Sequence, residues 1–150
     1  DVLAQLLELQ DTMPVVPTHE GLGYGRVGDL PSPRTLDRLL ATIQTQLNPP
    51  RLIYSPSANL QQLVERVAVL GGSGASFLSA VAQTGAQAYL TSDCKFHQFQ
   101  EGRDRNLILI DAGHYATERP ACARLVEKFE QQGVIWTQLS TADEDFRQFW

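Results

Sequence analysis

The chain has 150 residues, a formal net charge of -5 and 43% apolar residues, a composition that predicts one soluble globular domain with a sizeable core. This composition excludes disordered, collagen-like and low-complexity classes. The longest apolar runs, such as residues 107–110, are far shorter than the roughly 18 to 20 residues that cross a bilayer, so no membrane contact is expected. The acidic balance, without a cluster of arginines, argues against nucleic acid as a partner.

The cysteines and the start of the chain indicate its setting. Cys94 and Cys122 are far apart in sequence and lack a CxxC spacing, which indicates reduced thiols and a cytoplasmic location. The sequence opens at Asp1 with an amphipathic stretch and no methionine. We therefore expect a C-terminal fragment of a longer protein, although a removed tag or start methionine leaves the same pattern.

Proline and glycine divide the first third of the chain into short predicted elements. Apolar residues at helical spacing predict a helix over residues 1–10. Four glycines within residues 21–28 predict a glycine-rich strand or a bulged turn. Ser32 and Pro33 are typical of a helix start and predict a helix that continues to about residue 46.

From residue 51 onward the predicted strands and helices alternate. The predicted strands cover residues 51–54, 67–70, 88–90, 107–110 and 134–136. The predicted helical stretches cover residues 59–65, 75–84, 95–102 and 119–132. Alternation at this spacing indicates βαβ units and a mostly parallel sheet with helices on both faces. The predicted fold class is therefore α/β.

The last ten residues, 141–150, are acidic but carry three aromatic side chains, Phe146, Phe149 and Trp150. These side chains suit either a place in the core or a subunit contact. We expect the core placement.

Polar loops follow three of the predicted strands, and the carboxyl ends of parallel strands are where ligands collect. The first loop, Gly71–Gly74, would direct free N–H groups at a phosphate or carboxylate and makes Gly72, Ser73 and Gly74 candidate anion-binding residues. It lacks the lysine of a P-loop and the spacing of a dinucleotide fingerprint. A plain tight turn is therefore an open alternative.

The second loop places an acid, a cation and an imidazole at alternate positions, Asp93, Lys95 and His97. Such a set suits proton transfer or substrate orientation. Alternatively, Asp93 caps the next helix while Lys95 and His97 face solvent.

The third segment, residues 111–118, places His114 and Glu118 four apart, a spacing that joins two side chains on a helical turn and offers nitrogen and oxygen ligands to a divalent metal. Pro120 disfavours helix at Arg119, so we expect His114 in a loop and Glu118 near the helix start. A capping Glu118 and a hydrogen-bonded His114 are the alternative.

These segments together carry a family resemblance. The runs 67–76 (VAVLGGSGAS), 89–97 (YLTSDCKFH) and 111–118 (DAGHYATE) resemble the second half of the Nif-three-like family, whose bacterial members are often called GTP cyclohydrolase I type 2. The earlier run 21–30 (GLGYGRVGDL) is similar to the linker between the two halves of that family.

The resemblance implies a dinuclear metal site between two similar α/β halves, usually in a toroidal hexamer. It implies that His114 and Glu118 are ligands of a divalent metal, which is zinc, iron, manganese or magnesium. Asp93, Lys95 and His97 match the family segment Thr-Gly-Asp-x-Lys-x-His near that site, with Ser92 where the family has glycine.

One family feature is missing from this chain. The first half of the family supplies a His-His pair and an aspartate, and the sequence has no His-His pair. Since each ion needs at least four donors, we expect this chain alone to bind metal weakly or not at all. We expect residues 1–31 to be the end of the preceding half plus the linker, and residues 32–150 to be the C-terminal half-domain.

We expect the longer protein to be a metal-dependent hydrolase with a small-molecule or nucleotide substrate, GTP being the one the family name suggests. His97 is the predicted proton shuttle, with Asp93 as a second catalytic residue, while Lys95 and the glycine turn contact the substrate. The alternatives are a non-catalytic metal-binding scaffold or regulatory protein acting through a homo-oligomeric ring, and a plain nucleotide-binding module. A hexamer is expected for the longer protein, and a dimer is one option for the fragment alone.

Overall fold

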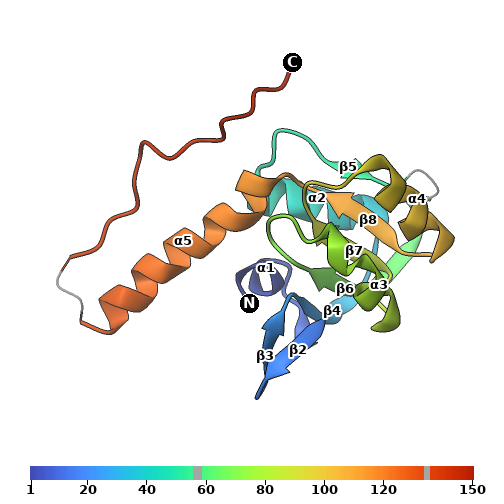
Figure 1. Cartoon of the computed structure of the whole chain (residues 1–150), viewed down its shortest axis with the longest axis horizontal. Helices are drawn as coiled ribbons and strands as arrows, with labels where there is room; N and C mark the ends of the chain where they lie inside the picture. Colours follow the sequence, from blue (N-terminus) through green and yellow to red (C-terminus); the bar gives the residue numbers. More distant parts are fainter. Residues whose placement is uncertain (56–58, 134–135) are drawn as a thin grey trace.

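Within residues 1–55, 59–133 and 136–150, which the computed structural model describes, a mixed sheet of six strands has the order β1-β4-β6-β7-β8-β5. The strands are β1 (Gln10–Met13), β4 (Arg26–Thr35), β5 (Ile53–Tyr54), β6 (Leu63–Val69), β7 (Ala88–Thr91) and β8 (Ile108–Asp111). A separate hairpin of β2 (Val16–His19) and β3 (Leu22–Tyr24) extends from the edge of the body (Figure 1).

The centre of the sheet is parallel. β6 pairs in parallel with β7, and β7 with β8, whereas the pairings of β1 with β4, β4 with β6 and β5 with β8 are antiparallel. The α/β class expected from the sequence is confirmed. Because β6, β7 and β8 share a direction, the loops that follow them gather at one edge of the sheet.

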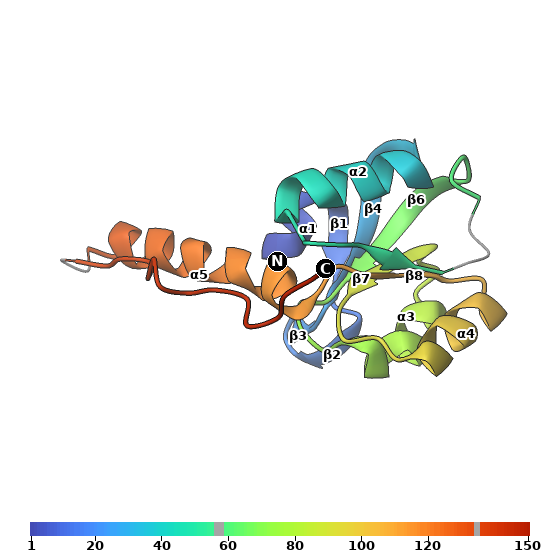
Figure 2. The same cartoon turned by 90° about the horizontal axis from the view of Figure 1, so that it is seen from above.

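Helices cover both faces of the sheet (Figure 2). One face carries α1 (Val2–Leu6) and α2 (Leu36–Leu47), and the other carries η1 (Ala75–Phe77), α3 (Leu78–Gln83) and α4 (Phe96–Asp104). Alternation along the strands builds the two cores: Leu90 belongs to the first core, and Tyr89 and Leu109 belong to the second.

α5 (His114–Gln131) starts at the carboxyl end of β8 and then extends away from the body as an arm (Figure 1). Its buried residues are Ala116 and Thr117, both in the first two turns. In the described part of the chain, none of the helices combines the length and the hydropathy needed to cross a membrane.

The prediction of a helix start at Ser32 and Pro33 is wrong, because both residues lie in β4. A register shift between Asp29 and Arg34 accommodates the prolines in this strand. The helix begins one residue after Thr35, whose hydroxyl accepts a hydrogen bond from the Arg38 N–H at 3.4 Å. β4 also crosses the division expected between residues 31 and 32.

Two other boundaries differ from the predicted ones. The first helix stops at Leu6 rather than at residue 10, and Glu8 has a left-handed backbone (φ 59°) that helices do not tolerate. No helix forms over residues 59–65, because β6 begins at Leu63 and pairs there with β4.

α5 begins five residues earlier than predicted and contains Pro120 in its interior. The hydrogen bond lost at proline is outweighed by the anchored first turn, where Ala116 and Thr117 are buried. The loop predicted for His114 is therefore wrong.

The segment after α5 does not match its predictions. Of the strand predicted over residues 134–136, the first two positions lie outside the described residues, and Trp136 is 77% exposed without strand structure. Phe146 is 94% exposed and Trp150 is fully exposed, so the expected core placement is wrong for these two side chains. Phe149 instead lies against the Arg51 guanidinium.

Candidate functional site

The first turn of α5 brings His114 and Glu118 together at the edge of the sheet. The His114 Nε2 lies 3.0 Å from Glu118 Oε2, and the other ring nitrogen, Nδ1, lies 2.5 Å from Asp93 Oδ2. Asp93 comes from the loop after β7. The imidazole is therefore held between two carboxylates, one from the loop after β7 and one from α5.

The spacing of these donor atoms matches the coordination of a divalent cation. Two ligand atoms that bind one tetrahedral ion at about 2.0 to 2.2 Å lie roughly 3.3 Å apart, close to the separation of His114 Nε2 and Glu118 Oε2. Asp93 occupies Nδ1 and so leaves Nε2 for a metal, which is the usual arrangement of a carboxylate behind a ligating histidine. One nitrogen and one oxygen donor therefore fit a divalent ion as half of its ligand set.

We call His114 and Glu118 the half-site, because the described residues do not supply the other ligands of a metal ion. In residues 1–55, 59–133 and 136–150, no group of three or more His, Cys, Asp or Glu side chains is arranged to hold a metal. An ion needs at least four donors. Further protein ligands would have to come from outside these residues.

The two carboxylates raise the pKa of His114 above its ordinary value of 6.5, and the hydrogen bond to Asp93 is the largest cause. The charged imidazolium is favoured because both of its N–H groups face an acceptor. Metal binding would replace the proton on Nε2.

The glycine turn packs directly beneath this pair. Gly72 has a left-handed backbone (φ 68°), and a Cβ at that position would collide with Glu118 Oε1. The Gly72 N–H donates to Thr117 Oγ1 at 3.0 Å, and the Thr117 hydroxyl contacts the Gly113 carbonyl oxygen at 3.0 Å. One buried threonine therefore ties the turn after β6 to the first turn of α5.

The N–H groups proposed for anion binding are engaged inside the protein. Besides the Gly72 bond to Thr117, the Gly74 N–H donates to Thr91 Oγ1 at 3.1 Å, and the Tyr89 hydroxyl donates to the Gly74 carbonyl at 2.7 Å. Ser73 is exposed. An anion at this turn would have to replace bonds of Gly72 or Gly74, and that role stays a prediction.

Lys95 and His97 lie to one side of the pair. Lys95 precedes α4 and its N–H donates to Gln98 Oε1 at 2.8 Å, while His97 lies on the first turn of α4. Both side chains are exposed, and none of the hydrogen bonds or ion pairs among the described residues joins them to His114. Of the three residues expected in this loop, the structure brings only Asp93 to the half-site.

Asp111, at the end of β8, has a role that the sequence did not predict. Its carboxylate accepts hydrogen bonds from the N–H groups of Cys94 at 2.8 Å and Gly113 at 2.9 Å. It therefore links the loop that carries Asp93 to the turn that precedes His114. Burial, with a further effect of Asp111, raises the pKa of the Cys94 thiol and makes this cysteine a poor nucleophile.

The C-terminal tail also reaches the site. Arg147 Nη1 lies 3.7 Å from Asp93 Oδ1, and the Tyr115 hydroxyl donates to the Asp143 carbonyl at 3.0 Å. The sequence carried no periodic signal for this contact, because more than 50 residues separate Arg147 from Asp93.

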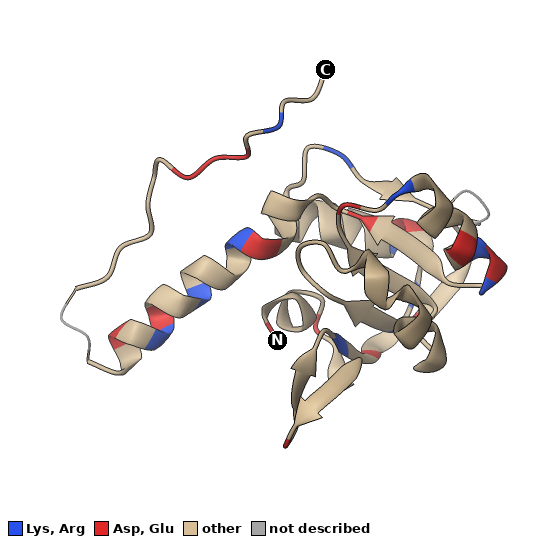
Figure 3. Cartoon of the chain, viewed as in Figure 1, with Lys and Arg blue, Asp and Glu red and all other residues tan. Residues whose placement is uncertain are grey.

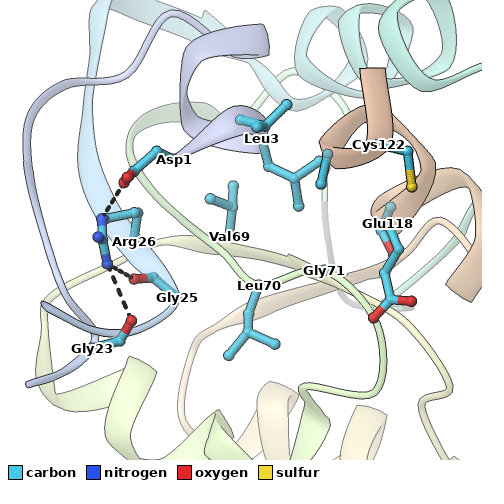
Figure 4. Close-up of a pocket in the computed structure, with 13 residues that line it drawn as sticks. Asp1, Leu3, Gly23, Gly25, Arg26, Val69, Leu70, Gly71, Glu118 and Cys122 are labelled. Atoms are coloured by element: carbon cyan, nitrogen blue, oxygen red, sulfur yellow. Dashed lines mark hydrogen bonds and ion pairs between the residues drawn. The ribbon is translucent and has the colours of Figure 1, made fainter. Parts of the chain in front are cut away.

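Two cavities meet at Glu118. The first, of 490 Å³, runs from Arg26 to Glu118 and Cys122 over a floor that includes Val69 and Leu70 (Figure 4). At the end of this cavity away from Glu118, the Arg26 guanidinium donates hydrogen bonds to the Asp1 carboxylate and to the carbonyls of Gly23 and Gly25. The second, of 390 Å³, lies between the first turns of α5 and the tail. A ligand in either cavity could therefore contact Glu118.

Comparisons with known proteins connect this geometry to a family. The family model described as Duf34/NIF3 (NGG1p interacting factor 3) matches residues 1–143. A Nostoc sp. protein named GTP cyclohydrolase 1 type 2 homolog is 70% identical over 149 residues, which are 99% of this chain and 57% of that protein. A Mycobacterium tuberculosis protein of the same name is 38% identical over 118 residues, 78% of this chain and 31% of that protein.

Solved structures share the fold. A Bacillus cereus protein related to NIF3 is 25% identical, with a TM-score of 0.73 over 87% of this chain and 37% of the other. The Staphylococcus aureus protein SA1388 has a TM-score of 0.80 over 99% of this chain and 63% of the other, at 19% identity. The chain thus spans 57% and 31% of the two named sequence relatives.

Proposed function

Because the chain belongs to the Duf34/NIF3 family, we propose that His114 and Glu118 supply one half of a divalent-metal centre, and that the completed centre serves hydrolysis. The observation that supports this is the arrangement of Asp93, His114 and Glu118: one carboxylate fixes Nδ1 while the second faces Nε2 at 3.0 Å. A structural ion pair needs only one of these carboxylates. A ligand pair with an orienting carboxylate needs both.

Each residue has a distinct part in this proposal. His114 Nε2 and the Glu118 carboxylate hold the ion, and Asp93 fixes the ring orientation of His114. Thr117 and Gly72 hold Glu118 at the sheet edge. A divalent cation bound there would act as a Lewis acid and activate water for attack on carbon or phosphorus.

The remaining ligands, the second ion and the homo-oligomeric state belong to the longer protein that we propose. The chain spans little more than half of its Nostoc relative, which leaves room for the missing donors outside it. The name of that relative supports a nucleotide substrate such as GTP. Zinc, iron, manganese and magnesium all accept a nitrogen and oxygen ligand set.

Zinc titration calorimetry on this chain tests the metal site. We expect weak binding that falls by about tenfold or more in His114→Ala and in Glu118→Gln, the loss typical of a removed ligand or its close support. Glu127→Gln, on the exposed part of the same helix, is the matched control and should bind zinc like the parent. Equal zinc affinity in all four proteins contradicts the proposal.

Hydrolysis is tested in the Nostoc relative, with the residues that match His114 and Glu118 replaced. Metal-dependent turnover of GTP that both replacements abolish supports the hydrolase. The equivalent replacement of His97 should lower turnover without removing metal, if His97 carries protons.

The second candidate function is a metal-binding scaffold or regulatory protein within an oligomeric ring. It is favoured by the apolar residues that α5 exposes on its arm, Leu125 at 52% and Phe129 at 44%. Bound metal without turnover would support this candidate over the hydrolase.

A further inference from the structure

A small cavity of 220 Å³ lies beside the half-site, where the loop before β5, the turn between β8 and α5, and the end of the tail meet. The tail runs back along α5 and ends close to the loop before β5 (Figures 1 and 2). The cavity is lined by Arg51 from that loop, by Ile53 at the start of β5, by Gly113 from the turn, and by Arg147 and Phe149 from the tail.

Two arginines converge on one aromatic ring in this cavity. The Arg51 Cζ lies 4.8 Å and the Arg147 Cζ 5.8 Å from the centroid of the Phe149 ring. Blue positions on the tail and on the loop before β5 mark these neighbouring charges (Figure 3). Two like charges side by side repel each other, and an anion bound between them would lower that repulsion.

The carboxylates nearby offset this charge only in part. The Asp145 carboxylate accepts hydrogen bonds from Nε and Nη2 of Arg147, each at 3.0 Å. The third nitrogen, Nη1, lies 3.7 Å from Asp93 Oδ1. Among the described residues, Arg51 forms no ion pair with a carboxylate.

The acidic groups that line the cavity are already engaged with other partners. Asp93 Oδ2 faces His114, and the two oxygens of Asp111 accept from the N–H groups of Cys94 and Gly113. Asp93 Oδ1 also lies 3.7 Å from Arg147 Nη1, so Asp93 offsets part of the Arg147 charge as well. Among the described residues, the Arg51 guanidinium has no carboxylate partner, and Arg147 Nη1 has only this long contact.

We propose that this cavity binds a phosphate group through Arg51 and Arg147. Guanidinium forks match the geometry of phosphate oxygens and bind them in pairs of hydrogen bonds. The volume of 220 Å³ is below the about 300 to 1,000 Å³ of pockets for drug-sized ligands, so it suits a single charged group and not a whole nucleotide.

The position of the cavity relates it to the metal half-site. Arg147 also lines the 390 Å³ cavity that contains His114 and Glu118, so the two cavities share a wall. This assignment rests on the proposed function: the bound phosphate is part of a substrate whose reacting atom lies at His114 and Glu118. Gly113 has a left-handed φ of 81°, which favours glycine, and a Cβ there would lie 3.1 Å from Arg147 Nη2 and crowd that guanidinium.

Inorganic phosphate titrated into the zinc-free chain, at constant ionic strength, tests the site by the NMR shifts of the Gly113 amide and the arginine Nε–H groups. Arg51→Gln and Arg147→Gln should each weaken binding by about tenfold, the effect of one lost charged hydrogen-bonding pair. Asp145→Asn should strengthen binding, because it frees the Arg147 fork. Arg124→Gln, on the α5 arm, is the matched control.

The phosphate titrations can support or overturn the proposed phosphate site. Phosphate that binds equally to the parent, Arg51→Gln and Arg147→Gln overturns the proposal, as does an Asp145→Asn variant that binds no tighter than the parent. If Arg147→Gln releases the tail, Arg51→Gln and Asp145→Asn still separate binding from folding. A nucleoside monophosphate whose affinity depends on Arg51 supports the substrate assignment, and one that binds independently of Arg51 contradicts it.

The proposed function fails in a different experiment. If His114→Ala leaves zinc binding unchanged while Arg51→Gln weakens phosphate binding, the metal site is contradicted and the phosphate site stands. If zinc binding depends on His114 but phosphate binding is independent of Arg51, only the phosphate site is contradicted.

Discussion

The two ends of α5 differ in how they are held. The first turns contain the buried Ala116 and Thr117, and the Thr117 hydroxyl links them to Gly72. The far end of the helix extends away from the body (Figure 1), and Leu125 and Phe129 on it are 52% and 44% exposed. His114 and Glu118 both lie on the anchored end.

This contrast shows why the anchored end is the place for chemistry. Side chains position a ligand only if neighbouring packing and hydrogen bonds fix the backbone that carries them. The arm makes few such contacts, so its side chains are better suited to contact another surface.

Replacing a leucine by alanine should lower the free energy of unfolding much more near the anchored end of α5 than on its arm. Leu90→Ala removes a fully buried side chain from the core that contains Ala116, and should lower the free energy of unfolding by about 2 to 5 kcal/mol. Leu125→Ala, on the arm, should cost less than about 0.5 kcal/mol. Urea unfolding measures both, and equal costs would contradict the contrast.

Gly72 leaves space for the Glu118 carboxylate, and Gly85 is a control for the strain of a left-handed backbone. Gly72→Ala and Gly85→Ala both place a side chain on a left-handed backbone (φ 68° and 77°), and each should cost about 1 kcal/mol of stability. Only at Gly72 does the new Cβ collide with Glu118, whereas nothing lies within 4 Å at Gly85. Zinc affinity should therefore fall in Gly72→Ala alone. A similar loss in Gly85→Ala would assign the effect to strain.

The smallest effect concerns the proton on His114. Asp93 is the main cause of the raised pKa of His114, so Asp93→Asn should lower that pKa. A raised folded-state pKa means that the ion pair stabilises the fold below about pH 6.5, and that this stability is lost as the pH rises through the raised value. In Asp93→Asn this pH dependence should shrink, because Glu118 still raises the pKa of His114. NMR titration of the imidazole protons measures it, and an unchanged His114 pKa would exclude Asp93 as the cause.

Local patterns predicted the centre of the fold. Apolar runs at 67–70, 88–90 and 107–110 form β6, β7 and β8, since strands buried on both faces have continuous apolar sequences. Once these strands are parallel, the loops with Asp93 and His114 must share an edge. Their meeting at 2.5 Å follows from topology.

The sequence predictions are wrong where contacts between residues far apart in the chain outweigh the local preference for helix or loop. Pro120 predicts a helix start after His114, but burial of Ala116 and Thr117 holds the helix through the proline. Ser32 and Pro33 resemble a helix cap, but the pairing of β4 with β6 extends the strand through them. Such effects depend on partners far along the chain, so no local pattern predicts them.

The most direct test of the account is a crystal structure of the chain soaked in zinc, with anomalous diffraction recorded at the zinc absorption edge. The account predicts a peak within about 2.0 to 2.2 Å of both His114 Nε2 and a Glu118 carboxylate oxygen, with Asp93 still hydrogen-bonded to Nδ1. A zinc ion bound elsewhere in the chain, with His114 and Glu118 left empty, would contradict the assignment of the half-site.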